Sequence, residues 1–147
     1  MAGDLIREVR RGTVSHLKAD VASKALVPVA NMHPSTTPPT PAWPFSRMDS
    51  FQSSAIDASC VTGATVTFQL HGFAKPKMQG TSVIETAEDQ ASRIGTAFKI
   101  AIHNTRVPID GGWFARLRVL SVRLLRDGDE EDAYHVVLSV EARVLAA

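Results

Sequence analysis

The chain of 147 residues carries 16 Lys and Arg against 15 Asp and Glu, is 44% hydrophobic and contains a single cysteine. This length is typical of one domain spanning 1–147, which needs neither a disulfide nor a metal to complete its core. A net charge of +1 provides no overall field to attract a polyanion. Cys60 alone forms no internal disulfide and no cysteine-based zinc site. Because no run approaches 18 apolar residues, we expect no signal peptide, no membrane span, and folding in the cytoplasm.

The first predicted element is an amphipathic helix from Asp4 to about Lys24. Asp4 is placed to cap its first turn, and apolar side chains recur every three or four residues. They are Ile6, Val9, Thr13, Leu17 and Val21. The opposite face is basic, which favours a solvated surface, with a nucleic-acid patch as the alternative.

A proline-rich arm follows the helix. Six of the eight prolines lie between Pro28 and Pro44, and proline disfavours helices and central strands, so this segment predicts irregular or extended chain. We interpret it as an ordered arm or linker, with a proline-rich ligand for an adaptor domain as the alternative. Trp43 and Phe45 alternate with Pro44 and Ser46, which indicates a short edge strand. The segment 49–59 gives no assignable pattern.

The segment TVTFQLHGFA, residues 65–74, predicts a strand. Val66, Phe68 and Leu70 share one face and alternate with polar residues, a period of two in β-favouring residues.

A second helix is predicted from Ser82 onward. Ser82 and Glu85 match a capping box, and an apolar stripe continues along the segment. The stripe consists of Ile84, Ala87, Ala91, Ile94, Phe98 and Ile102. Asp89 and Arg93 are spaced for an ion pair on the exposed face. We expect this helix to pack on a sheet.

The last part predicts a long β-hairpin. Its strands are Trp113 to Arg126 and Ala133 to Val144, joined by a turn containing Asp127-Gly128. In the first strand the apolar face changes midway, since Arg116 and Arg118 align with Leu120, which predicts a bulge or an end that protrudes beyond the core.

No pattern of catalysis or metal binding is present in the sequence. The five histidines occur singly, and the surroundings of Cys60 do not resemble those of a nucleophile. The acidic turn Asp127 to Asp132 is too short for a calcium loop, and no phosphate-binding glycine motif occurs. We therefore expect no enzyme activity and no cofactor. The basic strand between Trp113 and Arg126 could contact phosphate or the acidic turn of a neighbouring copy.

Taken in order, these parts resemble the tail completion or tail terminator proteins of long-tailed, siphovirus-like phages and gene transfer agents. The resemblance runs from about Leu5 to Val144. The segments that carry it are AWPF, TVTFQLHGFAK, ETAEDQASRIGTAFKIAIHN and RVLSVRLLRDGDEEDAYHVVLSVEARV.

The resemblance implies an α+β fold, a mainly antiparallel sheet with a long C-terminal hairpin, packed by the N-terminal and central helices. It also implies a structural protein of the virion neck, assembled in the host cytoplasm. Six copies would form a ring that caps the head-proximal end of the tail tube, ends tube polymerisation and joins the head. The implied partners are other copies, the tail tube protein, the head–tail connector or stopper, and DNA passing through the lumen without sequence specificity.

We expect the ring and tube contacts to involve the arm, the basic strand and the acidic turn. The residues are Trp43, Phe45, Trp113, Arg116, Arg118, Asp129, Glu130 and Glu131. Two alternatives remain open: another neck, head-completion or tail tube subunit, and a small nucleic-acid-binding module or enzyme of unrecognised type.

Overall fold

The computed structural model describes residues 4–58, 61–109, 113–128, 130 and 132–145. Its elements are the helices α1 (Leu5–Ala19), α2 (Val21–Leu26) and α3 (Ala87–Ile102), the short 3-10 helix η1 (Val29–Asn31), and the strands β1 (Phe45–Ala58), β2 (Val61–Ala74), β3 (Lys77–Gln79), β4 (Ser82–Glu85), β5 (Arg106–Ile109), β6 (Trp113–Arg126) and β7 (Tyr134–Leu145). The expected α+β class is confirmed.

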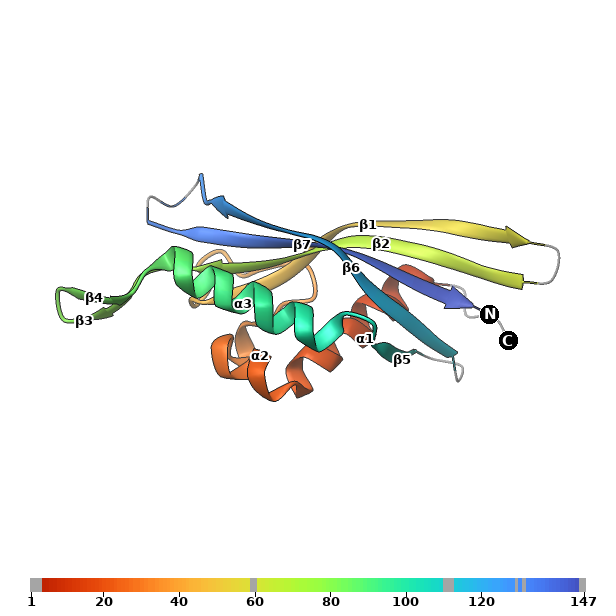
Figure 1. Ribbon diagram of the computed structural model, residues 1–147, viewed down its shortest axis with the longest axis horizontal. Coiled ribbons are helices and arrows are strands. Elements are labelled where there is room, and N and C mark those ends of the chain that lie inside the picture. The colour runs from red at the N-terminus through yellow and green to blue at the C-terminus, as the bar shows by residue number, and fades with distance from the viewer. Residues whose placement is uncertain (1–3, 59–60, 110–112, 129, 131, 146–147) are drawn as a thin grey trace.

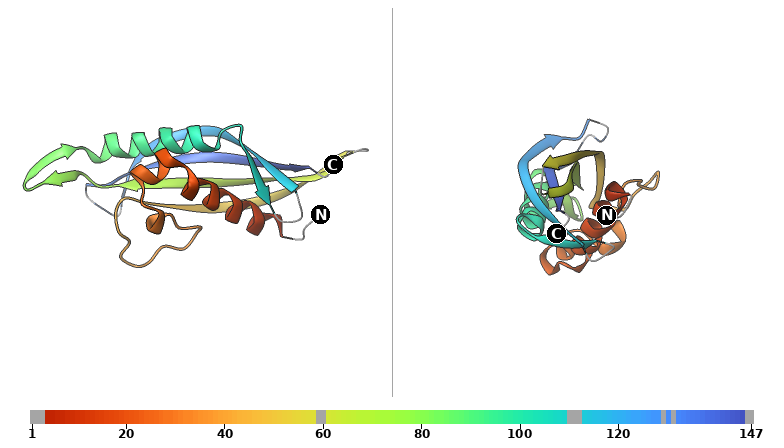
Figure 2. Two further views of the ribbon diagram at one scale, coloured as in Figure 1. Left: turned by 90° about the horizontal axis from the view of Figure 1, so that it is seen from below. Right: turned by 90° about the vertical axis from the view of Figure 1, so that its right-hand side faces the viewer.

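The five-stranded sheet has the order β1-β2-β7-β6-β5, and every neighbouring pair is antiparallel. All three α-helices lie on one side of this long, twisted sheet (Figure 1). Helix α1 contacts both β1 and β5, the two edge strands, because the sheet curls toward it (Figure 2). The small hairpin of β3 and β4 projects from one end of the molecule (Figure 1).

The predicted N-terminal helix is two helices, so a single helix to about Lys24 was wrong. Asp20 ends α1, and its carboxylate accepts hydrogen bonds from the Ser23 N–H and hydroxyl, which starts α2 in a new direction. Val9, Thr13 and Leu17 are buried as expected. Val21 lies beyond the break and is 74% exposed. The predicted cap by Asp4 is confirmed, since its carboxylate accepts from the Arg7 N–H at 3.0 Å.

The proline-rich arm folds back onto β1. Met32 is buried and bridges to Ser46, while the His33 N–H donates to the Ser46 carbonyl at 2.9 Å. The expected edge strand is present and includes Phe45 and Ser46, but β1 begins after Trp43 and Pro44 and runs for 14 residues, so the expected start and short length were wrong. The segment that gave no pattern is most of this strand, which pairs with β2 along nearly its whole length.

Helix α3 begins later than the capping box predicted. Ser82–Glu85 forms β4, and Thr86 is the residue that caps α3 by accepting from the Asp89 N–H. Ile84 is consequently 54% exposed instead of part of the helical stripe. The expected ion pair between Asp89 and Arg93 does not form. Arg93 pairs with Glu85 instead.

The remaining stripe of α3 packs on the sheet as predicted, with Ala91, Ile94, Phe98 and Ile102 buried. Two glycines allow the close approach. A Cβ on Gly95 would lie 2.6 Å from Val136 Cγ2, and one on Gly72 would lie 2.6 Å from Ile94 Cγ2.

Strands β6 and β7 form the predicted hairpin, with β6 matching its expected ends. The change of face in β6 has the expected cause, because the pairing with β7 shifts between Val119 and Ser121. Before this bulge Ala115, Leu117 and Val119 are buried, and after it every residue from Leu120 to Arg126 is exposed.

Candidate assembly surface

Three arginines lie side by side across three strands on the sheet face away from α3. Arg106 of β5 pairs in register with Arg116 of β6, which pairs with Arg143 of β7. Arg118, two residues along β6, lies opposite Glu141. All four arginine side chains are exposed. We call Arg106, Arg116, Arg118 and Arg143 the arginine row.

Three residues of the arginine row, Arg116, Arg118 and Arg143, line a shallow groove of about 530 Å³. His103 and Asn104 form one side of it, and Glu141 is the acid that lines it. The His103 Nδ1 accepts the Val119 N–H at 3.0 Å, which holds the ring at the edge of β6. Within the described part of the chain, no carboxylate lies within ion-pair distance of any arginine in the row. Like charges facing each other across strands are destabilising, so this face gains from contact with an anionic partner.

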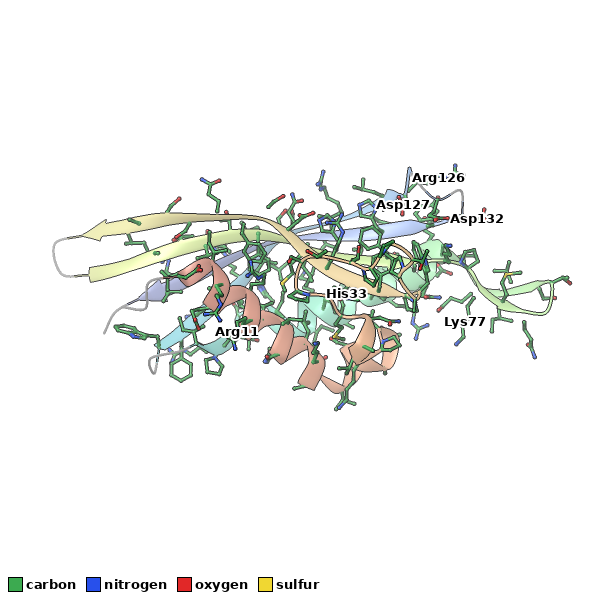
Figure 3. The ribbon with its side chains drawn as sticks, turned by 180° about the vertical axis from the view of Figure 1, so that it is seen from behind. Arg11, His33, Lys77, Arg126, Asp127 and Asp132 are labelled. Carbon is green, nitrogen blue, oxygen red and sulfur yellow. The ribbon has the colours of Figure 1, made fainter. Side chains whose placement is uncertain are left out.

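The acidic turn lies at the other end of the β6–β7 hairpin. Figure 3 shows Asp127 and Asp132 together there, beside Arg126. Glu130 forms an ion pair of 3.5 Å with Lys75, whose ammonium group also lies 4.6 Å from the ring centre of Trp43. Asp129 and Glu131, two of the predicted interface residues, lie outside the described residues. Eight residues of β6, about 26 Å, separate Arg118 from Arg126 beside the turn, so Asp127 and Asp132 do not meet the arginine row within one copy.

The aromatic residues of the arm pack within the chain. Trp43 meets Phe45 edge-on with ring centres 4.8 Å apart, and Phe45 stacks on Phe73 at 4.6 Å. Phe45 is buried, whereas Trp43 is half-buried and borders a groove beside the acidic turn. Trp113 packs partly against the core at the start of β6. Of these three predicted interface residues, Trp43 is the one with an accessible surface beside the acidic turn, which is itself predicted to contact a neighbouring copy.

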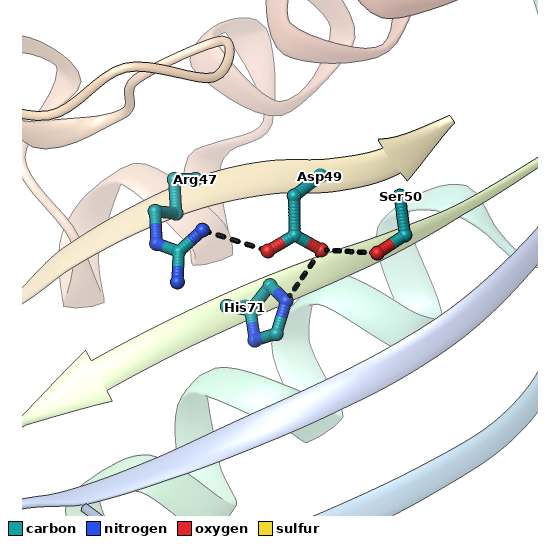
Figure 4. A network of polar contacts seen from close by, with 4 residues as sticks. All are labelled: Arg47, Asp49, Ser50 and His71. Atoms are coloured by element: carbon teal, nitrogen blue, oxygen red, sulfur yellow. Dashed lines mark hydrogen bonds and ion pairs between the residues drawn. The ribbon is translucent and has the colours of Figure 1, made fainter.

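A polar network joins β1 to β2 on the same face as the arginine row, farther along the sheet (Figure 4). The His71 Nε2–H donates to Asp49 at 2.9 Å, and Arg47 donates to the other carboxylate oxygen at 2.7 Å. Burial opposes ionisation of Asp49, but the hydrogen bond and charge of His71, together with Arg47, hold the pKa of this carboxyl below its ordinary value. The network fixes the register of β1.

His135 of β7 lies beside this network, with its ring centre 5.6 Å from that of His71. Burial, and then the charge of His71, lower the pKa of His135 below its ordinary value.

Among the described residues, no group of three or more His, Cys, Asp or Glu side chains is placed to hold a metal ion. Cys60 lies outside the described residues. The arrangement of His71 and Asp49 is that of a structural hydrogen bond between two strands.

Sequence reasoning identified Arg116 and Arg118 but missed Arg106 and Arg143. The signal was present, because Asp110-Gly111-Gly112 is a turn sequence between two β-type segments. The pairing of β5 with β6 places Arg106 beside Arg116, and the alternation of β7 places Arg143 on the same face. No described helix is long and apolar enough to cross a membrane.

Comparison with known proteins identifies relatives of this fold. The structure is similar to a chain from a solved structure titled "Virion of native gene transfer agent (GTA) particle", with a TM-score of 0.76 over 99% of this chain and 100% of that chain. The two sequences are 16% identical, so the similarity shows a shared fold. A search of curated proteins found no match. The family described as "Tail completion protein gp17" matches residues 13–145. Because this match covers nearly all of the chain, the protein belongs to the tail completion protein gp17 family and is a structural protein of a phage-like virion tail.

Proposed function

We propose that six copies of this chain form a closed ring at the head-proximal end of the tail tube. The ring ends polymerisation of the tube, binds the tail tube protein on one side and the head–tail connector or stopper on the other, and lets DNA pass through its lumen without sequence specificity. The tail completion family supports the placement at the tail, and the ring itself is our inference from the surface described above.

One observation carries this proposal: among the described residues, Glu141 is the acid beside the arginine row and no carboxylate lies within ion-pair distance of it, while the acidic turn lies at the opposite end of the same hairpin. A ring of identical copies uses heterologous contacts, in which one patch of a subunit meets a different patch of the next. Patches of opposite charge that cannot meet within one copy satisfy this requirement. The near-neutral total charge also suits a channel, because a strongly basic lumen would retain DNA.

The test reverses the charge of the row with the double variant Arg116→Glu and Arg118→Glu. We expect monomers that fold normally but no longer form rings or shorten tail tubes, as measured by native mass and by the length of tubes in electron micrographs. The control is Arg11→Glu with Lys24→Glu, an equal charge change at exposed positions on the helices, which should leave both readouts unchanged.

Three outcomes would contradict the proposal. Intact rings in the double variant would exclude the arginine row as a ring contact. Tubes that lengthen when the wild-type protein is added would indicate a tail tube subunit. A steep salt dependence of duplex DNA affinity that disappears in the double variant would indicate that the row binds nucleic acid instead.

A further inference from the structure

Strand β6 lacks a hydrogen-bonded neighbour on one side beyond Val119. Strand β5 pairs only with Trp113–Arg116, and the N–H groups of Leu117 and Val119 donate to Thr105 and His103. From Leu120 to Leu125 no described residue pairs with the outer edge. The Asp127 N–H points toward β7, where it donates to the Ala133 carbonyl. Because antiparallel strands alternate, the N–H groups of Val122 and Leu124 point outward.

The side chains of this open edge are apolar and exposed. Leu120 is 51% exposed, Val122 43%, and Leu124 and Leu125 37% each. Natural edge strands are usually protected by lysine, proline or a covering element, because a long apolar edge invites pairing with another chain. The bulge at Leu120 and the exposed Arg123 are the devices of this kind within the described residues. Four of the six residues from Leu120 to Leu125 are nevertheless apolar and exposed, which is typical of a strand that is covered in the assembled state.

The opposite edge of the same sheet is also open over part of its length. The arm covers β1 near Ser46, whose carbonyl accepts the His33 N–H and so points outward. Following the register through β2, the N–H groups of Ser53 and Ala55 also point outward. The residues from Gln52 to Ala55 are small or polar and exposed, so another strand can approach them closely.

We infer that the open edge of β6 pairs antiparallel with residues 51–56 of β1 in a second copy of this chain. This inference rests on the proposed ring and adds a backbone contact that is separate from the charge contact proposed above. Strand β6 runs opposite to β1 within one copy, since three antiparallel pairings separate them. In a ring with its axis along the sheet, every copy keeps the same direction, so β1 of the next copy arrives antiparallel to β6.

Charge favours this partner over a symmetric pairing of two β6 strands. Two antiparallel β6 edges centred on Val122 would bring Arg118 opposite Arg126, which is unfavourable. Residues 51–56, the proposed partner segment, contain no charged residue. The basic strand therefore meets a neutral one.

The offset of the two open edges is also consistent with closure. Val122 is level with Met48, whereas its proposed partner Ala55 lies six residues farther along when counted on β2, from Leu70 to Ala64. Six residues are about 20 Å along the strands, and four strands are about 19 Å across the sheet. The resulting tilt is about 45°, at the upper end of the roughly 35–45° found in closed sheets.

Site-resolved amide hydrogen exchange on monomer and assembled protein tests this pairing. We expect exchange at Val122, Leu124, Ser53 and Ala55 to slow by about tenfold or more on assembly, as for amides that gain a hydrogen bond. The Leu125 amide already faces β7 and serves as the internal control. The variant Leu124→Pro should abolish assembly and leave the monomer folded, because proline is tolerated where the missing N–H faces solvent. The matched variant Leu124→Thr keeps the N–H and should still assemble.

The outcomes separate this inference from the proposed function. Rings that form without slower exchange at either edge overturn the edge pairing and leave the ring intact. Slower exchange at Val122 and Leu124 alone overturns the assignment of β1 as the partner. If no closed assembly forms in the presence of tail tube protein, both the ring and the pairing fail. If the Leu124→Pro monomer unfolds, the same test is made with Val122→Pro. Assembly of the Val122→Pro variant counts against the inference.

Discussion

On the helix-covered face of the sheet, Gly95 approaches Val136 so closely that an added Cβ would lie 2.6 Å from a methyl group. On the other face, Arg106, Arg116 and Arg143 lie side by side and exposed. The first face leaves no room for another atom, whereas the second tolerates a repulsive arrangement that does not help folding. The difference indicates that stability is concentrated under α3 and that the outer face is available for assembly.

The largest effect on this comparison should come from Gly95→Ala. An alanine in an exposed helix is normally more stable than a glycine by about 1 kcal/mol. Here the overpacking against Val136 should reverse the sign and lower the free energy of unfolding by about 1–3 kcal/mol, measured by urea denaturation. The control Ser92→Ala, at an exposed position of the same helix, should be neutral or slightly stabilising. Equal effects of the two substitutions would show that α3 does not pack as tightly as described.

A smaller effect of opposite sign is expected from Arg116→Glu. The glutamate would lie between Arg106 and Arg143, replacing two repulsive cross-strand pairs by attractive ones. The isolated monomer should gain roughly 0.2–1 kcal/mol in free energy of unfolding, and the gain should shrink in high salt. Ring formation should weaken at the same time.

The matched variant for this test is Arg116→Gln, which removes the charge and keeps much of the side chain. Its stability should lie between those of the wild type and Arg116→Glu. If Arg116→Glu destabilises the monomer at low salt, the arginine row stabilises the fold. The hypothesis that the row lowers the stability of the monomer and is kept for assembly would then be wrong.

The parts of the fold that sequence predicted are those with strong local patterns. Strand β6 is one long run of β-favouring residues that ends at an Asp-Gly turn, so both of its ends were predicted. The stripe of α3 likewise carries its own period. Strand β1 could not be predicted, because its serine- and alanine-rich residues have no alternation and are held by pairing with β2. Long-range register decided that element.

Two further differences between prediction and structure arise where the same sequence motif is compatible with two local structures. Ser82 and Glu85 match a capping box, but Thr86 caps the helix and the residues before it pair as a hairpin. Asp20 fits an exposed helical position, but its carboxylate instead caps α2. In the candidate site, Arg116 and Arg118 follow from the sequence, whereas the row depends on which strands are neighbours. Arg106 and Arg143 join it through register alone.

The smallest expected effect concerns His135, at the other end of the outer face. There burial, and not repulsion between exposed arginines, has the largest influence on the charge of the side chain. The pKa of His135 is lowered from 6.5 by burial and by His71, so the unfolded chain binds a proton more readily than the native one. The free energy of unfolding should therefore be fully supported above about pH 6.5 and fall as the pH drops through the lowered pKa. His135→Gln should flatten this dependence between pH 7.5 and pH 5, measured by urea denaturation at each pH. Asp49 does not interfere in that range, because its contribution is lost only as the pH falls below 3.8 toward its lowered pKa. An unchanged slope in His135→Gln would assign the acid sensitivity to another group, and a shallow slope in the wild type would mean that this end of the face is as open to water as the arginine row.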